Sequence, residues 1–299
     1  MRPYTLLLVL LFMIGEAAAQ AYPAKTVRIV VPFPPSGAAD IIARVFAPKF
    51  AEALGQPIVI DNRAGANGNV GTEIIARSAP DGYGLLFGGS GTLAISPSLY
   101  AKLPFDPVRD FVPIGLVAVQ PHVLAVHPSV RAKSVKELIA LAKSRPGQLN
   151  FASAGSGSVV HLAGELFNIA AKIKTQHIPY KGAGPALTDL IGGQVQMYFA
   201  VPTSAIPYIK TGRLKANATG GERRSPALPQ GPTFSEAGLS GFNMGSWHGV
   251  ITMACAPKEI IDKISTEIAK ILTMPDIKEK LLSQGMDPFI STPASNSPR

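Results

Sequence analysis

The fold of this chain is decided by a stretch that reads Val30-Val31-Pro32-Phe33-Pro34-Pro35-Ser36-Gly37-Ala38-Ala39-Asp40. The apolar run 27–31 predicts a buried strand, and the prolines that follow end it because proline fixes φ and lacks an N–H donor. From Asp40 onward, apolar residues recur at helical spacing, which predicts a helix over residues 40–54. The small residues 36–39 leave the first amides of that helix uncovered, so the turn suits an anion, although an ordinary strand–helix turn is equally compatible.

Four further predicted strands also end in loops of small and polar residues. These loops cover residues 64–69, 88–92, 153–158 and 181–184. In open α/β sheets, ligands bind outside the carboxyl ends of the strands. One such loop is weak evidence, but five together favour a small-ligand site.

The amino terminus resembles a secretory signal. Arg2 supplies the positive start, residues 4–14 form an apolar run, and small residues around Ala19 offer a cleavage site. The run is too short to cross a bilayer, which needs roughly 20 apolar residues. We therefore expect residues 1–21 to be removed and the protein to be soluble in the periplasm, with an uncleaved anchor as the alternative. The one cysteine, Cys255, is expected to be a buried small hydrophobe.

Composition argues against a nucleic-acid partner. The chain has 28 Lys and Arg against 19 Asp and Glu, but the basic residues are scattered and aromatic residues make up only 7%. Nucleic-acid-binding domains gather their basic residues on one face. The positive surplus could instead draw anionic solutes by long-range steering.

Strands and helices alternate along residues 27–199, which predicts an α/β protein with mostly parallel sheets. The apolar stretch 112–126, interrupted at Pro121, is predicted to cross between two lobes, and residues 214–219 are predicted to return. This divides the chain into a first lobe of residues 22–121 plus 221–299 and a second lobe of residues 122–220. Two crossing segments form a natural hinge for closure on a ligand.

The sequence holds no pattern that demands catalysis. Residues 155–158 approach a dinucleotide fingerprint, but the third glycine and the later acidic residue are absent, so no nucleotide cofactor is expected. No G-x-S-x-G motif occurs, and the five histidines lack metal-ligand spacing. We expect no catalytic residue, metal or other cofactor, although a catalytic triad need not be local in sequence.

Beyond these patterns, many ordered motifs carry a family resemblance. They include residues 31–40, 55–63, 79–83, 103–111, 152–165, 179–182, 192–195, 224–229, 236–239 and 246–247. Together they resemble the tripartite tricarboxylate transporter substrate-binding receptors of the Bug type. The similarity extends from about residue 22 to residue 293.

The resemblance implies a two-lobed periplasmic binding-protein fold of type II topology, with the ligand cleft between the lobes. It implies a monomeric, non-catalytic receptor that captures a small di- or tricarboxylate or aromatic acid and delivers it to membrane permease subunits. In that family, backbone amides and waters hold one carboxylate. Mapped onto this chain, the ligand site would comprise Phe33, Pro35, Ser36, Gly37, Ala38, Asn67, Ser90, Thr92, Ser153, Ala154, Gly155, Ser156, Gly157, Ser158, Tyr180, Lys181 and Gly182.

Three other side chains of the resembling motifs have less direct roles. Asp40 is expected to orient its own helix, because its charge would repel an anionic ligand. His161 is expected to be a packed or hydrogen-bonded structural residue, with ligand contact as the alternative. Trp247 could form a wall of the site or be part of the core.

The chain departs from the family pattern at three places. Ser36 replaces a glycine of the first loop, with Ala39 where a threonine is common, and Ala200 stands where an aspartate is frequent. Without that carboxylate, an amino-acid ligand is disfavoured and an apolar or aromatic acid is favoured. Family members also continue past Pro293 with a helix that residues 294–299 cannot form, which predicts an exposed apolar groove. A sensing receptor for a membrane signalling partner and an exported hydrolase remain the alternative functions.

Overall fold

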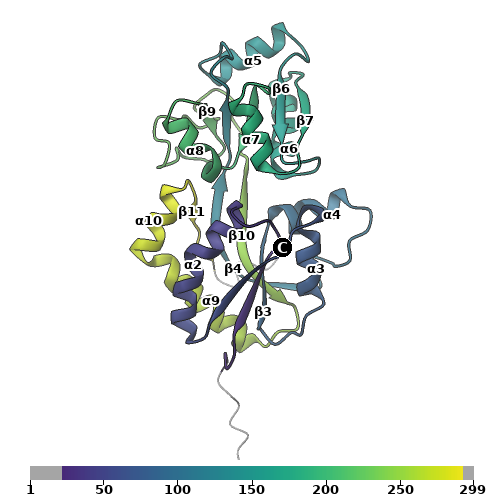
Figure 1. Cartoon of the computed structure of the whole chain (residues 1–299), viewed down its shortest axis with the longest axis vertical. Helices are drawn as coiled ribbons and strands as arrows, with labels where there is room; N and C mark the ends of the chain where they lie inside the picture. Colours follow the sequence, from purple (N-terminus) through teal and green to yellow (C-terminus); the bar gives the residue numbers. More distant parts are fainter. Residues whose placement is uncertain (1–21, 292–299) are drawn as a thin grey trace, which may run out of the picture.

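The computed structural model describes residues 22–291. It is an α/β protein of two lobes, each built on its own β-sheet (Figure 1). The predicted signal segment 1–21 lies outside the described residues. Among the residues that are described, no helix has the length and apolarity that spanning a membrane requires.

The first lobe contains a six-stranded sheet of order β11-β4-β10-β3-β1-β2. Strands β1, β2 and β3 run parallel, whereas β10 is antiparallel to both β3 and β4. The strands are β1 (Val27–Val31), β2 (Ile58–Asn62), β3 (Gly84–Gly89), β4 (Phe111–Pro121), β10 (Gly245–Met253) and β11 (Asp287–Pro288). The helical elements are α2 (Ala38–Leu54), η1 (Ala66–Gly68), α3 (Asn69–Ala76), η2 (Gly91–Ile95), α4 (Ser96–Leu99), α9 (Lys258–Thr273) and α10 (Pro275–Ser283).

The core of the first lobe explains why α2 forms where it does. Its buried residues recur at helical spacing, and Phe46 stacks on Phe87 of β3 with ring centroids 6.2 Å apart. Helix α9 packs against the same cluster through Ile264 and Ile268. The opposite face of the sheet carries a smaller cluster that includes Phe111 and a residue of α3.

The second lobe contains a five-stranded sheet of order β7-β6-β8-β5-β9. Its strands are β5 (Val123–Val126), β6 (Asn150–Ser153), β7 (Gln176–Pro179), β8 (Met197–Ala200) and β9 (Lys215–Thr219). Its helices are α5 (Val135–Ser144), α6 (Val159–Ala171), α7 (Ala183–Ile191) and α8 (Pro202–Lys210). Ser134 caps α5 by accepting a hydrogen bond from the Glu137 amide.

Strands β4 and β10 form the two connections between the sheets (Figure 1). Strand β4 ends at Pro121, and β5 of the second sheet begins two residues later, at Val123. Strand β9 belongs wholly to the second sheet, and the chain returns to the first sheet at β10. Phe234 and Phe242 come after the expected boundary at residue 220, yet they pack against Phe199 in the second-lobe core. Long-range aromatic packing therefore keeps residues 221–244 with the second lobe.

The expectation for Cys255 is wrong. This residue is exposed, because it lies in the turn between β10 and α9 rather than inside either element. A turn runs over the surface, so small apolar side chains within it are not drawn into the core.

Candidate functional site

The first-lobe loop between β1 and α2 is held in place by Asp40. The Asp40 carboxylate accepts hydrogen bonds from the Ser36 amide at 2.9 Å, from Arg44 Nε at 2.9 Å and from Asn62 Nδ2 at 3.0 Å. Asn62 Nδ2 also donates to the Phe33 carbonyl at 3.0 Å. Burial alone would raise the pKa of Asp40, but the bonds from Arg44, Ser36 and Asn62 outweigh it and lower the pKa. The Asp40 carboxylate thus holds the loop that leads into its own helix.

This geometry turns the start of α2 into a set of uncovered amides. Ser36 adopts φ 63°, a left-handed conformation, and Gly37 is the N-cap residue with no side-chain cap bond. The first amides of any α-helix lack an intrahelical carbonyl, which leaves those of Ala38 and Ala39 available. The loop therefore offers donors and partial positive charge to an anion.

Two side-chain donors stand beside this loop without partners. Asn67 of η1 and Ser90 at the end of β3 have buried polar atoms, Asn67 Nδ2 and Ser90 Oγ, with no hydrogen-bond partner among the described residues. They lie close together, since a Cβ atom added at Gly91 would be 3.9 Å from Asn67 Nδ2. Buried polar groups are nearly always paired, so both atoms are suited to receive an acceptor group of a ligand.

Other predicted residues of the first lobe have packing roles. Thr92 is fully buried, and its hydroxyl donates to the Gly89 carbonyl at 3.3 Å. Gly68 leaves the space for Thr92 and Phe33, since a Cβ atom there would lie 2.4 Å from Thr92 Cγ2 and 3.3 Å from Phe33 Cζ. The structure thus brings Phe33, Asn67, Ser90 and Thr92 into one cluster. Pro35 lies in the same loop, one residue before Ser36, and is exposed.

The second-lobe loop, residues 153–158, is bonded mainly within itself. Ser153 Oγ accepts from the Gly155 amide at 3.1 Å and lies 2.6 Å from His177 Nε2. The Gly157 amide donates to His161 Nδ1 at 3.1 Å, and the Ser158 hydroxyl donates to the Gly155 carbonyl at 2.6 Å. No hydrogen bond among the described residues uses the amides of Ala154 and Ser156, which are therefore this loop's remaining donors.

Two stacked histidines, His161 and His177, contact that loop through hydrogen-bonding groups. The rings of His161 and His177 have centroids 4.0 Å apart, and both stack near Phe151. Burial and the neighbouring His161 lower the pKa of His177, and Glu165 opposes them in part. His161 Nδ1 accepts a hydrogen bond from the Gly157 amide, which ties its ring to the loop.

In the loop after β7, Tyr180 and Gly182 already form hydrogen bonds within the protein. The Tyr180 hydroxyl donates to Asp189 Oδ2 at 2.7 Å, and burial together with this bond raises the pKa of Tyr180 to about 12. The Gly182 amide donates to the Ala154 carbonyl at 3.2 Å, which joins this loop to the loop of residues 153–158. Lys181 is exposed between them.

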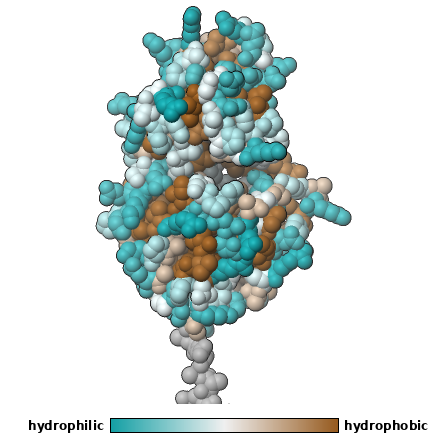
Figure 2. All heavy atoms as spheres, in the orientation of Figure 1, coloured by the Kyte–Doolittle hydropathy of each residue, from teal (hydrophilic) through white to brown (hydrophobic). Residues whose placement is uncertain are grey.

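The loops of the two lobes face each other. A Cβ atom at Gly91 would lie 3.8 Å from Val159 Cγ2, and one at Gly157 would lie 2.8 Å from Leu99 Cδ1. Figure 2 shows a narrow opening between the lobes at this level. The structure therefore places the end of β3 opposite the start of α6, as a ligand cleft between lobes requires.

A polar cluster on the crossing strands was missed by sequence reasoning. It consists of Gln120, His122, Ser246 and His248, in which His122 Nε2 lies 2.9 Å from Ser246 Oγ. The signal was present as polar residues two apart in otherwise apolar strands, but the histidines were judged only for metal spacing. No group of three metal-ligating side chains occurs within residues 22–291.

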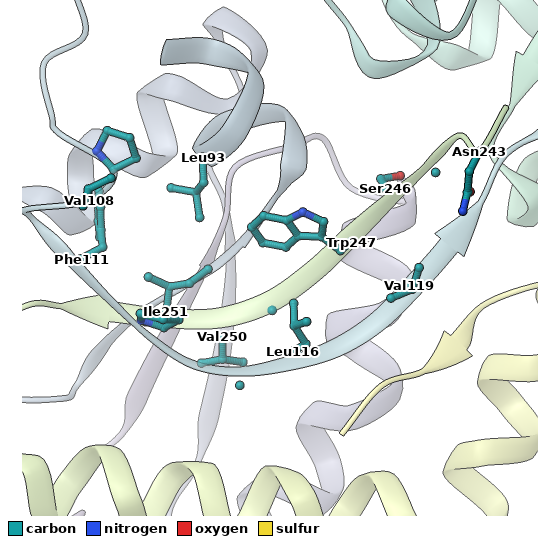
Figure 3. Close-up of a pocket in the computed structure, with 15 residues that line it drawn as sticks. Leu93, Val108, Phe111, Leu116, Val119, Asn243, Ser246, Trp247, Val250 and Ile251 are labelled. Atoms are coloured by element: carbon teal, nitrogen blue, oxygen red, sulfur yellow. The ribbon is translucent and has the colours of Figure 1, made fainter. Parts of the chain in front are cut away.

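An apolar cavity of about 580 Å³ lies elsewhere, on the face of the first-lobe sheet over β4 and β10 (Figure 3). It contains none of the predicted ligand-binding residues, and Trp247 forms one of its walls. The apolar groove expected at the missing C-terminal helix stays a prediction, since residues 292–299 lie outside the described part. The lining residues are Leu93, Pro107, Val108, Phe111, Pro113, Gly115, Leu116, Val119, Asn243, Gly245, Ser246, Trp247, Gly249, Val250 and Ile251.

Residues 42–296 match the family described as "Tripartite tricarboxylate transporter family receptor". The chain belongs to this family. Protein BugT of Bordetella pertussis is 38% identical over 280 residues, which cover 93% of this chain and 86% of that protein. A UPF0065 protein from the tcbD-tcbE intergenic region of Pseudomonas sp. strain P51 is 38% identical over 267 residues, covering 89% of this chain and 79% of that protein.

Solved structures of receptors agree with the two-lobed fold. The chain is similar to Rpa4515 of R. palustris with adipate, at a TM-score of 0.86 and 33% identity over 91% of each chain. It is also similar to MatC of Rhodopseudomonas palustris with bound malate, at a TM-score of 0.81 and 33% identity, covering 92% of this chain and 93% of that chain. Receptors of this tripartite tricarboxylate family are periplasmic solute-binding proteins.

Proposed function

We propose that this receptor holds one carboxylate of a small organic acid between its lobes in the periplasm and delivers the acid to membrane permease subunits of a tripartite transporter. Two relatives of the same fold carry adipate and malate, which supports a carboxylate ligand. The observation that carries the proposal is the pair of buried, unpartnered donors of Asn67 and Ser90 beside the uncovered start of α2.

In this proposal the carboxylate is recognised without a cationic side chain. Its oxygens accept hydrogen bonds from Asn67, Ser90 and the amides at Ala38 and Ala39, and the helix N-terminus adds a favourable dipole. Across the cleft, the amides of Ala154 and Ser156 complete the shell. Asp40 stays paired with Arg44, so its negative charge does not oppose the ligand.

Ligand capture follows from closure about the two crossing strands. We place the lobe boundaries at Pro121 and at the start of β10, with residues 221–244 moving with the second lobe. Contacts that only the closed form can make shift the population from open to closed. The proposed donors lie on both lobes, so a ligand can bind all of them only in the closed form. Ala200 at the end of β8 offers no carboxylate, so a ligand ammonium would lack a partner there.

Calorimetric titration of the purified receptor with dicarboxylates, tricarboxylates, aromatic acids and amino acids tests the proposal. We expect a micromolar acid ligand, equivalent to about −8 kcal/mol, recovered unchanged by mass spectrometry. Ser90→Ala is expected to weaken that acid about tenfold, whereas Ser283→Ala on α10, an exposed serine, serves as the matched control. Binding unaffected by Ser90→Ala, preference for an amino acid, or recovery of a converted product would contradict the proposal.

A further inference from the structure

Buried polar atoms without partners are concentrated around the cleft. Within residues 22–291, they occur in Asn67, Asn69, Ser90, Gln120, His122, Tyr198, Asn217 and His248. Asn67 and Ser90 belong to the first-lobe site already described, and Asn69 is the first residue of α3. Gln120, His122 and His248 belong to the crossing strands, and the carboxylate site proposed above does not use them.

These three side chains converge on one face of the hinge. Gln120 pairs with Ser246, and Ala118 pairs with His248, so the side chains of Gln120, Ser246 and His248 point to the same side of the sheet. His122 follows two residues after Gln120 and reaches Ser246 Oγ at 2.9 Å. The shared face is that of α2, because the His248 ring stacks on Phe87 with centroids 6.0 Å apart.

The cluster also lies next to the strand end that leads into the carboxylate site. His248 pairs with Gly89, the residue before Ser90, and a Cβ atom at Gly89 would lie 3.1 Å from His248 Nδ1. Ser90 directly follows Gly89, so the cluster lies beside the strand end that carries the proposed carboxylate site.

The chemistry of the cluster is polar but uncharged. Gln120 is fully buried, and among residues 22–291 both its amide nitrogen and its amide oxygen lack partners, as do Nδ1 of His122 and Nδ1 of His248. None of these residues forms an ion pair with another residue of the described part of the chain. Burial, together with the neighbouring His248, lowers the pKa of His122 to about 4, and burial lowers the pKa of His248 to about 4, so both rings are neutral at neutral pH.

We propose that Gln120, His122 and His248 form a second subsite, which binds a neutral hydroxyl group at the far end of a monocarboxylate ligand. A hydroxyl both donates and accepts, and so it can pair with the amide oxygen and nitrogen of Gln120 and with an imidazole nitrogen. A second carboxylate would be buried here without a cation, which is costly. The inference rests on the proposed function, because the carboxylate site anchors the other end of the ligand.

Calorimetry with two length-matched sets of acids tests this subsite. One set is butyrate, its terminal hydroxy derivative and succinate; the other is hexanoate, its terminal hydroxy derivative and adipate. We expect the hydroxy acid of one set to bind at least about tenfold more tightly than both companions. His248→Phe and Gln120→Leu, which keep approximate side-chain volume, should bring the three affinities within about threefold.

Matched variants separate this inference from the proposed function. Ser90→Ala should weaken all three acids of a set equally, and His127→Phe, a histidine away from the cluster, should leave the preference intact. Tighter binding of the dicarboxylate in both sets, or a hydroxy-acid preference that survives both cluster variants, overturns the subsite while the carboxylate site stands. Absence of binding by every acid overturns both.

Discussion

The loops on the two sides of the cleft are built from similar small residues but bonded differently. In the first lobe, Asn67 and Ser90 leave buried donors unpaired, and one carboxylate, Asp40, holds the backbone from behind. In the second lobe, Ser153 and His161 accept the bonds of the Gly155 and Gly157 amides, so the loop satisfies most of its own donors.

The difference indicates that the two loops contribute differently to ligand binding, which we call the division of work. Unpaired buried donors destabilise a loop until an acceptor binds them. We therefore expect the first lobe to supply most of the ligand's hydrogen bonds. A loop that is bonded within itself is preorganised and supplies shape with few remaining amides. Substitutions should therefore affect the two loops unequally.

The largest difference is expected between Gly68→Ala and Gly155→Ala. Gly68 has φ 91°, and its new Cβ would lie 2.4 Å from Thr92 Cγ2 in a fully buried site, whereas at Gly155, with φ 128°, the nearest atom would be 3.4 Å away. We expect Gly68→Ala to cost about 2–4 kcal/mol and to abolish binding, and Gly155→Ala to cost about 1–2 kcal/mol with weakened binding. Denaturant unfolding and calorimetry measure both.

Gly147→Ala is the control for this pair. Its φ is 74° with nothing within 4 Å of the added atom, so it carries backbone strain alone and should leave affinity unchanged. Equal losses of affinity from Gly68→Ala and Gly155→Ala would contradict the division of work.

A smaller effect is expected from Asp40→Asn. The substitution keeps the shape but removes the charge that binds Arg44 and the Ser36 amide, so the first-lobe loop should loosen. We expect affinity to fall about fivefold and stability by about 1–2 kcal/mol. Arg44→Gln is the comparison variant, because that side chain is 54% exposed and its loss should cost less. Equal effects of the two variants would argue that the ion pair, rather than the bond to Ser36, holds the loop.

The smallest effect on stability is expected in an acid titration, in which the two loops should respond at different pH values. The pKa of His177 is lowered, so the folded protein resists protonation there, and the stability this residue contributes begins to fall as pH drops below the ordinary 6.5. The pKa of Asp40 is also lowered, so its contribution is present above 3.8 and is lost only below that pH.

Amide NMR shifts resolve these two events at single residues. The Gly155 amide, which is bonded to Ser153 beside His177, should shift before the Ser36 amide, which is bonded to Asp40. Simultaneous shifts would indicate global unfolding rather than two separately held loops.

Much of the fold could be predicted from the sequence because the apolar periodicity is strong. β1 lies where the apolar run 27–31 indicates, and α2 begins two residues earlier than Asp40 because Gly37 already provides the extended N-cap. The packing of Phe234 and Phe242 in the second-lobe core could not be predicted, because it depends on contacts with residues far away in sequence.

The sequence indicates which loops form the candidate site, but not which of their atoms are free to bind a ligand. Strand ends rich in glycine and serine indicate an anion site, yet only the structure distinguishes Ser90, whose hydroxyl is unpaired, from Thr92, whose hydroxyl is bonded. The hinge cluster depends on the pairing of β4 with β10, which joins residues more than a hundred positions apart. No local pattern encodes that register.

Trp247 gives the molecule a built-in optical reporter. It is the one tryptophan in the sequence, it stands between Ser246 and His248 on a crossing strand, and its ring borders the apolar cavity (Figure 3). Indole emission depends on the polarity around the ring. A rotation of the lobes about β10 should move the residues next to Trp247 and so change that polarity. The wavelength of intrinsic fluorescence should therefore follow lobe closure in real time, without a label and in the unaltered protein.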